Sequence, residues 1–273
     1  CRMITAFFSM FALCVVQTYL CSASCLYILW NPEAWVIVNS LMNNKGAIVG
    51  TQAKQVIAIV GGTGDLGGGL ARRFARAGFR VLIGSRNHAA ADESSADLKA
   101  LAATSGWGDI DVEGMDNPSA ARLGDIVFVT VPFSAQSATL KSIAAEVQGK
   151  IVIDVTVPLV PPRVARVQLP AGGSAGQIAQ HLLGDSVHVV SALQNVAAAH
   201  LNSDDAVECD VLVTGDNKDA RQVVVDLLAA IDLQGFHAGP IDNAAAAEAL
   251  TSVLINLNKQ YKTHAGIKIT GIR

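Results

Sequence analysis

Short runs of consecutive apolar residues alternate along the chain with stretches in which apolar residues recur at helical spacing. Residues 56–60 form a continuous apolar run, as expected of a strand that is buried on both faces. After a glycine-rich segment, residues 70–77 predict a helix that ends at Gly78. Residues 79–83 predict a second strand, which completes a strand–helix–strand unit.

The same alternation continues through the rest of the chain. Further strands are predicted at residues 110–113, 125–131, 151–155, 187–191, 210–214 and 235–238. Helices are predicted between them, one ending near residue 104 and others at 134–147, 175–183 and 219–231. Strands that alternate with helices indicate a doubly wound parallel sheet. We therefore predict an α/β fold whose smaller C-terminal α/β portion ends in a buried helix at residues 243–262.

Residues 1–41 differ in kind from the rest of the 273-residue chain. They hold four of the five cysteines, and the uncharged run 4–30 is long enough to span a bilayer as a helix. Two interpretations stay open. The segment is either a membrane anchor or a non-native extension, and we favour the second because the chain begins at Cys1 and Met42 opens a polar leader. The lone Cys209 elsewhere suits a reducing, cytoplasmic location.

Composition excludes two classes of protein. The formal net charge is −3, which rules out a nucleic-acid binder that works through a broad basic surface. Hydrophobic residues make up 51% of the chain, far more than a disordered protein contains. We expect small-molecule partners and no nucleic acid, with a membrane partner only if residues 4–30 are native.

The glycine-rich segment at residues 62–67 has the pattern G-x-G-x-x-G between a predicted strand and a predicted helix. In this context Gly62 permits a tight turn, Gly64 lets backbone N–H groups approach a pyrophosphate, and Gly67 allows close packing of helix on strand. The N-terminus of the helix adds a partial positive charge. The segment therefore predicts a dinucleotide-binding site in a Rossmann-type fold.

The end of the second predicted strand indicates which dinucleotide binds. NAD-binding proteins place a carboxylate there, whereas this chain has Ser85 and Arg86 and no carboxylate before Asp92. A hydroxyl and a guanidinium suit the 2′-phosphate of NADP, because charge-assisted hydrogen bonds to phosphate are strong. We predict NADP(H) as the coenzyme.

Other motifs are given structural interpretations. Residues 172–176 match the G-x-S-x-G pattern of hydrolases, but a proline-rich connection precedes them and Ser174 is better explained as the N-cap of the next helix. The six histidines have no metal-ligand spacing, and the N-terminal cysteines lack a C-x-x-C pair. No metal site is predicted.

Several motifs together resemble one known family. The segment at residues 60–70 and Gly84-Ser85-Arg86 closely resemble the NADP-dependent reductases of coenzyme F420. Further matches follow in order at residues 130–133, 157–161, 174–178, 189–193, 239–240, 248–251 and 266–268. The resemblance covers about residues 55–272.

The resemblance implies direct hydride transfer between NADP(H) and the deazaflavin of F420, with no catalytic side chain. It carries these residues over to NADP binding: Thr63, Gly64, Asp65, Leu66, Ser85 and Arg86, with Val131, Pro132 and Phe133 near the path to the nicotinamide. It places Gln194, Asn195 and Val196 on the F420 side, together with the C-terminal helix. It also implies a homodimer.

The predicted organisation is an apolar extension at 1–50, an NADP-binding domain at 54–190 and a C-terminal part at 191–273. Two positions depart from the family pattern, since Ala90 stands where members often have Lys and Gln194 where well-known members have His. Two alternatives therefore stay open. One is an NADPH-dependent reductase of the same fold with another acceptor, including a membrane-tethered metalloreductase, and the other is a non-enzymatic NADP(H) sensor.

Overall fold

Six parallel strands form the central sheet, in the order β3-β2-β1-β4-β5-β6. The computed structural model describes residues 55–272, which lie within one compact unit. The strands are β1 (Ile57–Val60), β2 (Val81–Ser85), β3 (Val112–Asp116), β4 (Ile126–Val129), β5 (Ile151–Asp154) and β6 (His188–Ser191). The chain runs outward from β1 to β3, returns to β4 beside β1, and then runs outward the other way. The prediction of a doubly wound Rossmann-type sheet is confirmed.

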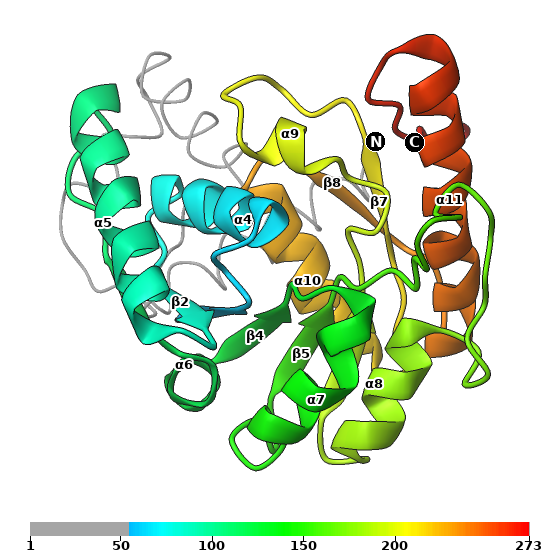
Figure 1. Ribbon diagram of the computed structural model, residues 1–273, viewed down its shortest axis with the longest axis horizontal. Coiled ribbons are helices and arrows are strands. Elements are labelled where there is room, and N and C mark those ends of the chain that lie inside the picture. Colours follow the sequence, from blue (N-terminus) through cyan, green and yellow to red (C-terminus); the bar gives the residue numbers. More distant parts are fainter. Residues whose placement is uncertain (1–54, 273) are drawn as a thin grey trace, which may run out of the picture. The chain divides into compact units, whose positions relative to one another are not determined.

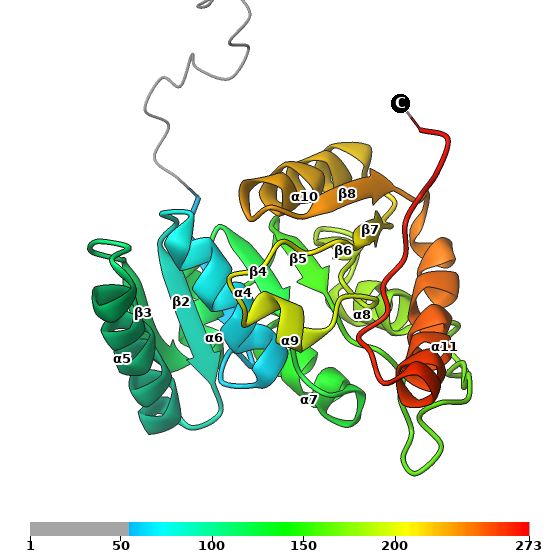
Figure 2. The same ribbon diagram turned by 90° about the horizontal axis from the view of Figure 1, so that it is seen from above.

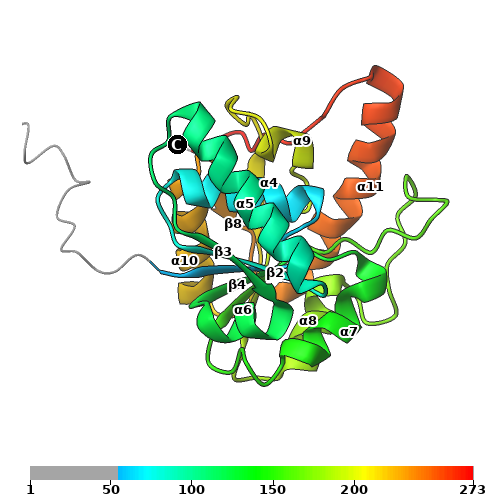
Figure 3. The same cartoon turned by 60° about the vertical axis from the view of Figure 1, so that its left-hand side comes forward.

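Helices cover both faces of this sheet, as Figure 3 shows. On one face lie α4 (Asp65–Arg76) and α5 (His88–Ser105), and on the other lie α6 (Asn117–Leu123), α7 (Phe133–Ile143) and α8 (Ala175–Leu183). A long C-terminal helix, α11 (Ala244–Tyr261), lies beside the connection that links β5 to α8 (Figure 1). Parallel strands need such crossover helices, and both faces of the sheet are then buried.

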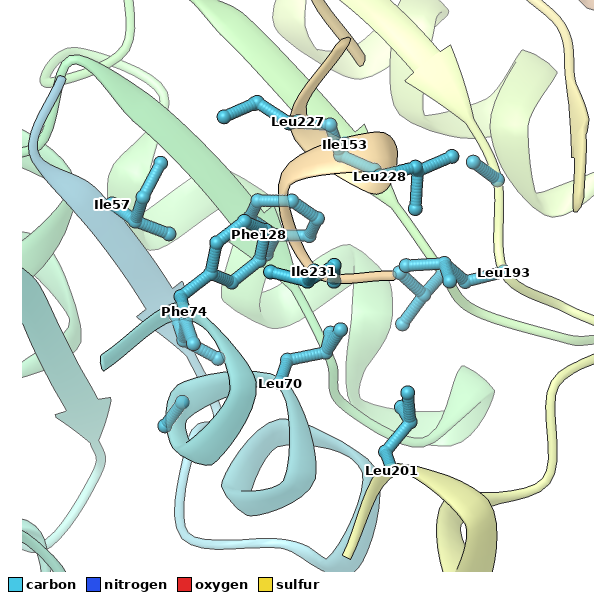
Figure 4. Close-up of a cluster of buried hydrophobic side chains, with 14 of the residues drawn as sticks. Ile57, Leu70, Phe74, Phe128, Ile153, Leu193, Leu201, Leu227, Leu228 and Ile231 are labelled. Atoms are coloured by element: carbon cyan, nitrogen blue, oxygen red, sulfur yellow. The ribbon is translucent and has the colours of Figure 1, made fainter. Parts of the chain in front are cut away.

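Successive residues of each strand point to opposite faces of the sheet and so belong to two separate hydrophobic clusters. Ile57 and Ile59 of β1 face the cluster under α4, whereas Ala58 and Val60 face the cluster under α6 and α7. Figure 4 shows Leu70 and Phe74 of α4 lying among the side chains of the first cluster. The Phe74 ring lies 5.2 Å from that of Phe128 in β4, measured between centroids. This packing fixes the first helix, and with it the glycine-rich turn, on the sheet.

A second, smaller unit of structure follows β6. The short helix α9 (Ala198–Leu201) comes first, and then β7 (Asp210–Val213), α10 (Lys218–Ala230) and β8 (Gln234–His237) form a parallel pair with its crossover helix (Figure 2). A single turn of 3-10 helix, η1 (Ile241–Asn243), precedes α11. An antiparallel bridge between Ser191 and Thr214 joins β7 to the end of β6.

Most predicted elements are present, with four differences. Helix α4 begins at Asp65 and not at residue 70, and the strand predicted at 110–113 lies at 112–116. The short helices α6 and α9 were not predicted. Helix α11 buries one face, while Val253 and Tyr261 on it are exposed in the single chain.

Membrane insertion was predicted only for residues 4–30, which lie outside the described residues. Within residues 55–272, no helix combines the length and the hydropathy needed to cross a membrane.

Candidate functional site

The turn after β1 presents backbone N–H groups at the carboxyl edge of the sheet. Helix α4 begins directly behind this turn, and no side chain caps Gly64, its N-cap residue. The amides of the first helical turn have no intrahelical acceptor. A Cβ added at Gly64 would meet only the carbonyl oxygen of Gly61, at 3.6 Å. The turn therefore offers donors and open space for an anionic ligand.

The neighbouring glycines serve the opposite purpose, which is close packing. A Cβ at Gly67 would lie 2.7 Å from the Cα of Gly62 and 2.6 Å from Thr130 Oγ1. A Cβ at Gly62 would lie 2.8 Å from the carbonyl oxygen of Ile59. These two positions admit no side chain without a backbone shift. Thr63, Asp65 and Leu66 complete the turn, and Thr63 and Asp65 are exposed to solvent.

The end of β2 lies against this turn. The amides of Gly61 and Gly62 both donate to the carbonyl oxygen of Gly84, at 3.0 and 2.9 Å. Ser85 is buried and accepts a hydrogen bond from the amide of Asn87, whereas Arg86 is exposed. Among residues 55–272, no ion pair or hydrogen bond engages the Arg86 guanidinium, so its charge is available to a ligand.

Asn117 is a site residue that the sequence did not reveal. Its side chain is buried, and its Oδ1 accepts from the amide of Gly61 at 3.2 Å. A Cβ added at Gly84 would lie 2.9 Å from Asn117 Oδ1, so Asn117 also packs closely against the end of β2. Asn117 thus supports the glycine turn from β3. No local motif marks it, because it follows β3 and is 56 residues from Gly61.

Val131, Pro132 and Phe133 follow β4 on the other side of the turn. Pro132 is exposed at the start of α7, while Val131 and Phe133 are half-buried. Thr156, after β5, donates from its hydroxyl to the carbonyl oxygen of Val131 at 3.4 Å. The ends of β2, β1, β4 and β5 therefore form one continuous edge.

Gln194, Asn195 and Val196 lie beyond β6, and all three are buried. Gln194 Nε2 donates to the Asp154 carbonyl oxygen at 3.0 Å and to Ser191 Oγ at 2.8 Å. Asn195 Nδ2 donates to the Asp210 carbonyl oxygen at 2.7 Å. The side-chain amides of Gln194 and Asn195 thus donate to other groups of the protein, while Gln194 Oε1 is buried and has no hydrogen-bond partner among residues 55–272.

The same turn and α11 line a cavity of about 110 Å³. Its lining includes Gln194, Asn195, Val196 and Ala197 from the turn, and Thr251, Leu254, Ile255 and Asn258 from α11. Thr251 Oγ1 donates to the carbonyl oxygen of Gln194 at 2.8 Å, which fastens α11 to the turn. Leu193 has φ = 75°, a conformation that costs a non-glycine residue about 1–2 kcal/mol. Surrounding contacts therefore impose the shape of this turn.

Two buried carboxyl groups lie behind this turn, and neither was predicted. Glu248 of α11 accepts from the amides of Ala175 and Gly176, at 2.7 and 3.0 Å, and so caps the N-terminus of α8. Asp154 accepts from Gln136 Nε2 at 2.6 Å. Burial raises the pKa of Glu248 to about 7 and that of Asp154 to about 6. The only sequence signal that could have revealed Glu248 is an acidic residue within an apolar helix.

Ser174 has the structural role that the sequence indicated. Its hydroxyl accepts from the amide of Gln177 at 3.0 Å as the N-cap of α8, and the side chain is fully buried. A nucleophile needs an exposed hydroxyl beside a base. The hydrolase motif at residues 172–176 is therefore a helix start.

Comparisons with known proteins agree with this geometry. Residues 56–158 match the family described as NADP oxidoreductase coenzyme F420-dependent. The chain is 40% identical over 223 residues to an F420-dependent NADP reductase of Methanothermobacter thermautotrophicus, an alignment that covers 79% of this chain and 95% of that protein. A protein of the same name from Methanocaldococcus jannaschii is 38% identical, with 79% and 98% covered.

A solved structure of a candidate F420-dependent NADP reductase from Arthrobacter sp. FB24 aligns with a TM-score of 0.65. It covers 80% of this chain and 99% of that one at 23% identity, which supports the fold. The two archaeal reductases match along nearly their whole length at 38% identity or more. The chain therefore belongs to the family of F420-dependent NADP reductases.

Proposed function

We propose that this protein transfers a hydride directly between NADP(H) and coenzyme F420. The observation that carries the proposal is the row of carboxyl ends of the strands, where an open glycine turn follows β1 and a second cavity lies beyond β6. Ligands of doubly wound sheets bind at this edge. A reaction between two coenzymes needs both positions on one surface.

The residues at the glycine turn fit NADP(H). The free amides behind Gly64 suit the pyrophosphate, and the space above Gly64 permits its approach. Arg86 at the end of β2 is exposed and has no partner among the described residues. Its guanidinium group can therefore bind the 2′-phosphate of NADP. Ser85 supplies a neighbouring hydroxyl. Val131, Pro132 and Phe133 then border the path toward the nicotinamide.

The cavity between the Gln194 turn and α11 suits one side of a deazaflavin ring. Its lining combines apolar side chains, such as Val196 and Leu254, with a small number of polar groups. The side-chain amides of Gln194 and Asn195 are engaged by other groups of the protein, whereas Gln194 Oε1 is buried and accepts no hydrogen bond from residues 55–272, so it is available to a donor on the ring.

When bound, NADPH supplies a hydride from its nicotinamide C4 to C5 of the deazaflavin, and water supplies the accompanying proton. The residues of this chain then have three tasks. They bind the phosphates at Gly64 and Arg86, they orient the two rings toward each other, and they exclude water from between them. No side chain has to form a covalent bond.

Three further features complete the proposal. A boundary between an NADP-binding part and a C-terminal part at residues 190–191 is supported by the end of β6, the last strand of the central sheet, at Ser191. A homodimer is supported by the exposed apolar side chains Val253 and Tyr261 on α11. A cytoplasmic location is supported by Cys209, the free buried cysteine among the described residues.

The test mixes the protein with NADPH and oxidised F420 and follows the loss of the visible absorbance of the deazaflavin. We expect rapid loss with NADPH and little with NADH. Tight NADPH binding without any loss of absorbance would contradict the proposal and favour another acceptor or a sensor. Failure to bind NADPH would contradict the assignment of the glycine turn as well.

A further inference from the structure

A groove of about 520 Å³ runs between α11 and the connection from β5 to α8. Figures 1 and 2 show this connection, in green, lying beside the helix. The groove is lined by Pro162, Arg163, Val164, Ala165 and Arg166 from the connection and by Ile255 and Lys259 from α11. Four of its seven lining residues are therefore apolar, and the other three are cations.

Among the described residues, these three cations have no acidic partner in an ion pair. The ion pairs among residues 55–272 use other cations, such as Arg72 with Asp204 and Lys268 with Asp210. Arg163, Arg166 and Lys259 take part in none of them. The sequence beyond Glu248 contains no acidic residue at all. In a chain of net charge −3, this is a local concentration of unpaired positive charge.

The connection is held in place although it has no regular secondary structure. Gln168 Nε2 donates to the carbonyl oxygens of Val160 and Arg163, both at 3.3 Å. Ser252 of α11 donates from its hydroxyl to the carbonyl oxygen of Arg166, also at 3.3 Å. The two arginines therefore project from a backbone that is tied to the same helix that carries Lys259.

The groove adjoins the cavity assigned to the deazaflavin. Ile255 lines both of them, and α11 forms one wall of each. A ligand that places a ring in the smaller cavity can therefore continue along α11 into the basic groove. The continuation must be anionic to match the three cations, and long enough to pass Ile255.

We propose that this groove binds the anionic chain of the deazaflavin coenzyme, through its phosphate and carboxylate groups. The inference rests on the proposed function, since F420 carries such a chain beyond its ribityl group. Guanidinium groups bind phosphate and carboxylate with paired hydrogen bonds, and Lys259 adds a point charge. The apolar lining residues suit the methylene groups of the chain.

The experiment compares intact F420 with its riboflavin-level form, which has the same ring and ribityl group but no phosphate or carboxylate. The variant combines Arg163→Gln, Arg166→Gln and Lys259→Gln. A matched control combines Lys99→Gln, Arg122→Gln and Lys218→Gln, which removes the same charge from exposed positions on other helices. Binding is measured without NADP(H) from the fluorescence of the deazaflavin, and turnover is measured with NADPH.

We expect the groove variant to raise the Kd and KM for F420 about tenfold, because exposed ion pairs are individually weak and three are lost. The kcat, the KM for NADPH and the Kd for the riboflavin-level form stay unchanged. Added salt weakens binding of F420 to the unaltered protein and has little effect on the variant. The control variant binds F420 normally.

Equal Kd values for F420 in the groove variant and the unaltered protein would overturn the inference. An equal loss of affinity for the riboflavin-level form would do the same, since the groove would then act through the ring. If either of these results is obtained but the unaltered protein still reduces F420 with NADPH, the proposed function stands. If the unaltered protein reduces neither F420 nor its riboflavin-level form, the proposed function itself is wrong.

Discussion

The glycine turn at residues 61–67 and the wall formed by residues 194–197 with α11 lie at the same edge of the sheet but are built from different groups. The turn consists of backbone amides and glycines within seven consecutive residues. The wall depends on buried polar side chains, whose partners are far away in sequence. Thr251 and Gln194 are 57 residues apart, and Glu248 and Ala175 are 73 apart.

The difference affects how each region responds to change. At the turn, a substitution acts on sterics, and its effect depends on which direction the Cβ points. At the wall, a substitution acts on hydrogen bonds and charge in an interior of low dielectric, where a lost partner is costly. Binding and stability should therefore be separable at Gly64, the open position of the turn, and inseparable at the wall.

The largest expected effect separates binding from stability at the turn. Gly64→Val places its side chain in the open space above the turn, where only Gly61 is near. The valine side chain then prevents the pyrophosphate from binding but does not disturb the fold. We expect NADPH affinity to fall about a thousandfold or more, equivalent to about 4 kcal/mol, with little change in Tm. Calorimetric titration and thermal unfolding measure the two quantities.

A control at Gly67 gives the opposite pattern. Gly67→Ala brings a Cβ against the backbone of Gly62 at 2.7 Å, so the helix must move. We expect a loss of about 1–3 kcal/mol in the free energy of unfolding as well as weaker binding. A Gly64→Val protein that binds NADPH normally would break the comparison, because the turn would then not be the phosphate site.

The next effect concerns charge in the wall. The pKa of Glu248 rises from 4.5 to about 7 on folding, because burial disfavours the charged carboxylate. The folded protein therefore holds more protons than the unfolded chain between these values. Its stability is greatest below about pH 4.5 from this group and is lost as the pH rises through about 7.

Glu248→Gln removes this pH dependence. The difference in unfolding free energy between the unaltered protein and the variant should change by about 3 kcal/mol between pH 4 and pH 8, with the unaltered protein losing the more. Urea unfolding at a series of pH values measures it. A constant difference across this range would mean that folding does not change the pKa of Glu248. Charge would then contribute no more to the stability of the wall than to that of the turn.

The smallest of the three effects concerns the charge beside the turn. Arg86→Asp replaces an exposed cation, which no residue of 55–272 pairs with, by an anion at the end of β2. NADPH affinity should fall about thirtyfold, or about 2 kcal/mol, from the loss of a charge-assisted bond and added repulsion. NADH affinity should stay nearly constant. Arg122→Asp, on the exposed part of α6, is the matched control, and a similar ratio in both variants would remove Arg86 from the site.

This contrast also explains what the sequence could predict. The strand runs and the pattern at residues 62–67 are local, so the sheet, its winding and the glycine turn were all predictable. Helix α4 was predicted to begin five residues late because its first turn is rich in glycine, a poor helix former. The short helices α6 and α9 give too few residues for a periodic signal.

The buried polar groups could not be found in the same way. Asn117 acquires its role from Gly61, 56 residues away, and the side chains of Gln136 and Asp154 bond to each other across 18 residues. Gln194, Asn195 and Val196 were named from the resemblance to a family and from no pattern of their own. Their assignment to the F420 side stays a prediction.

The run Gly67, Gly68 and Gly69 in α4 has a consequence for the order of folding. Each glycine costs a helix about 1 kcal/mol relative to alanine, so this segment does not become helical in the unfolded chain. It needs a surface to dock on, and that surface includes Thr130 after β4 and Leu201 in α9. Leu201 lies 132 residues beyond Gly69, so loop closure must come first. We therefore expect the glycine turn to form after the transition state for folding.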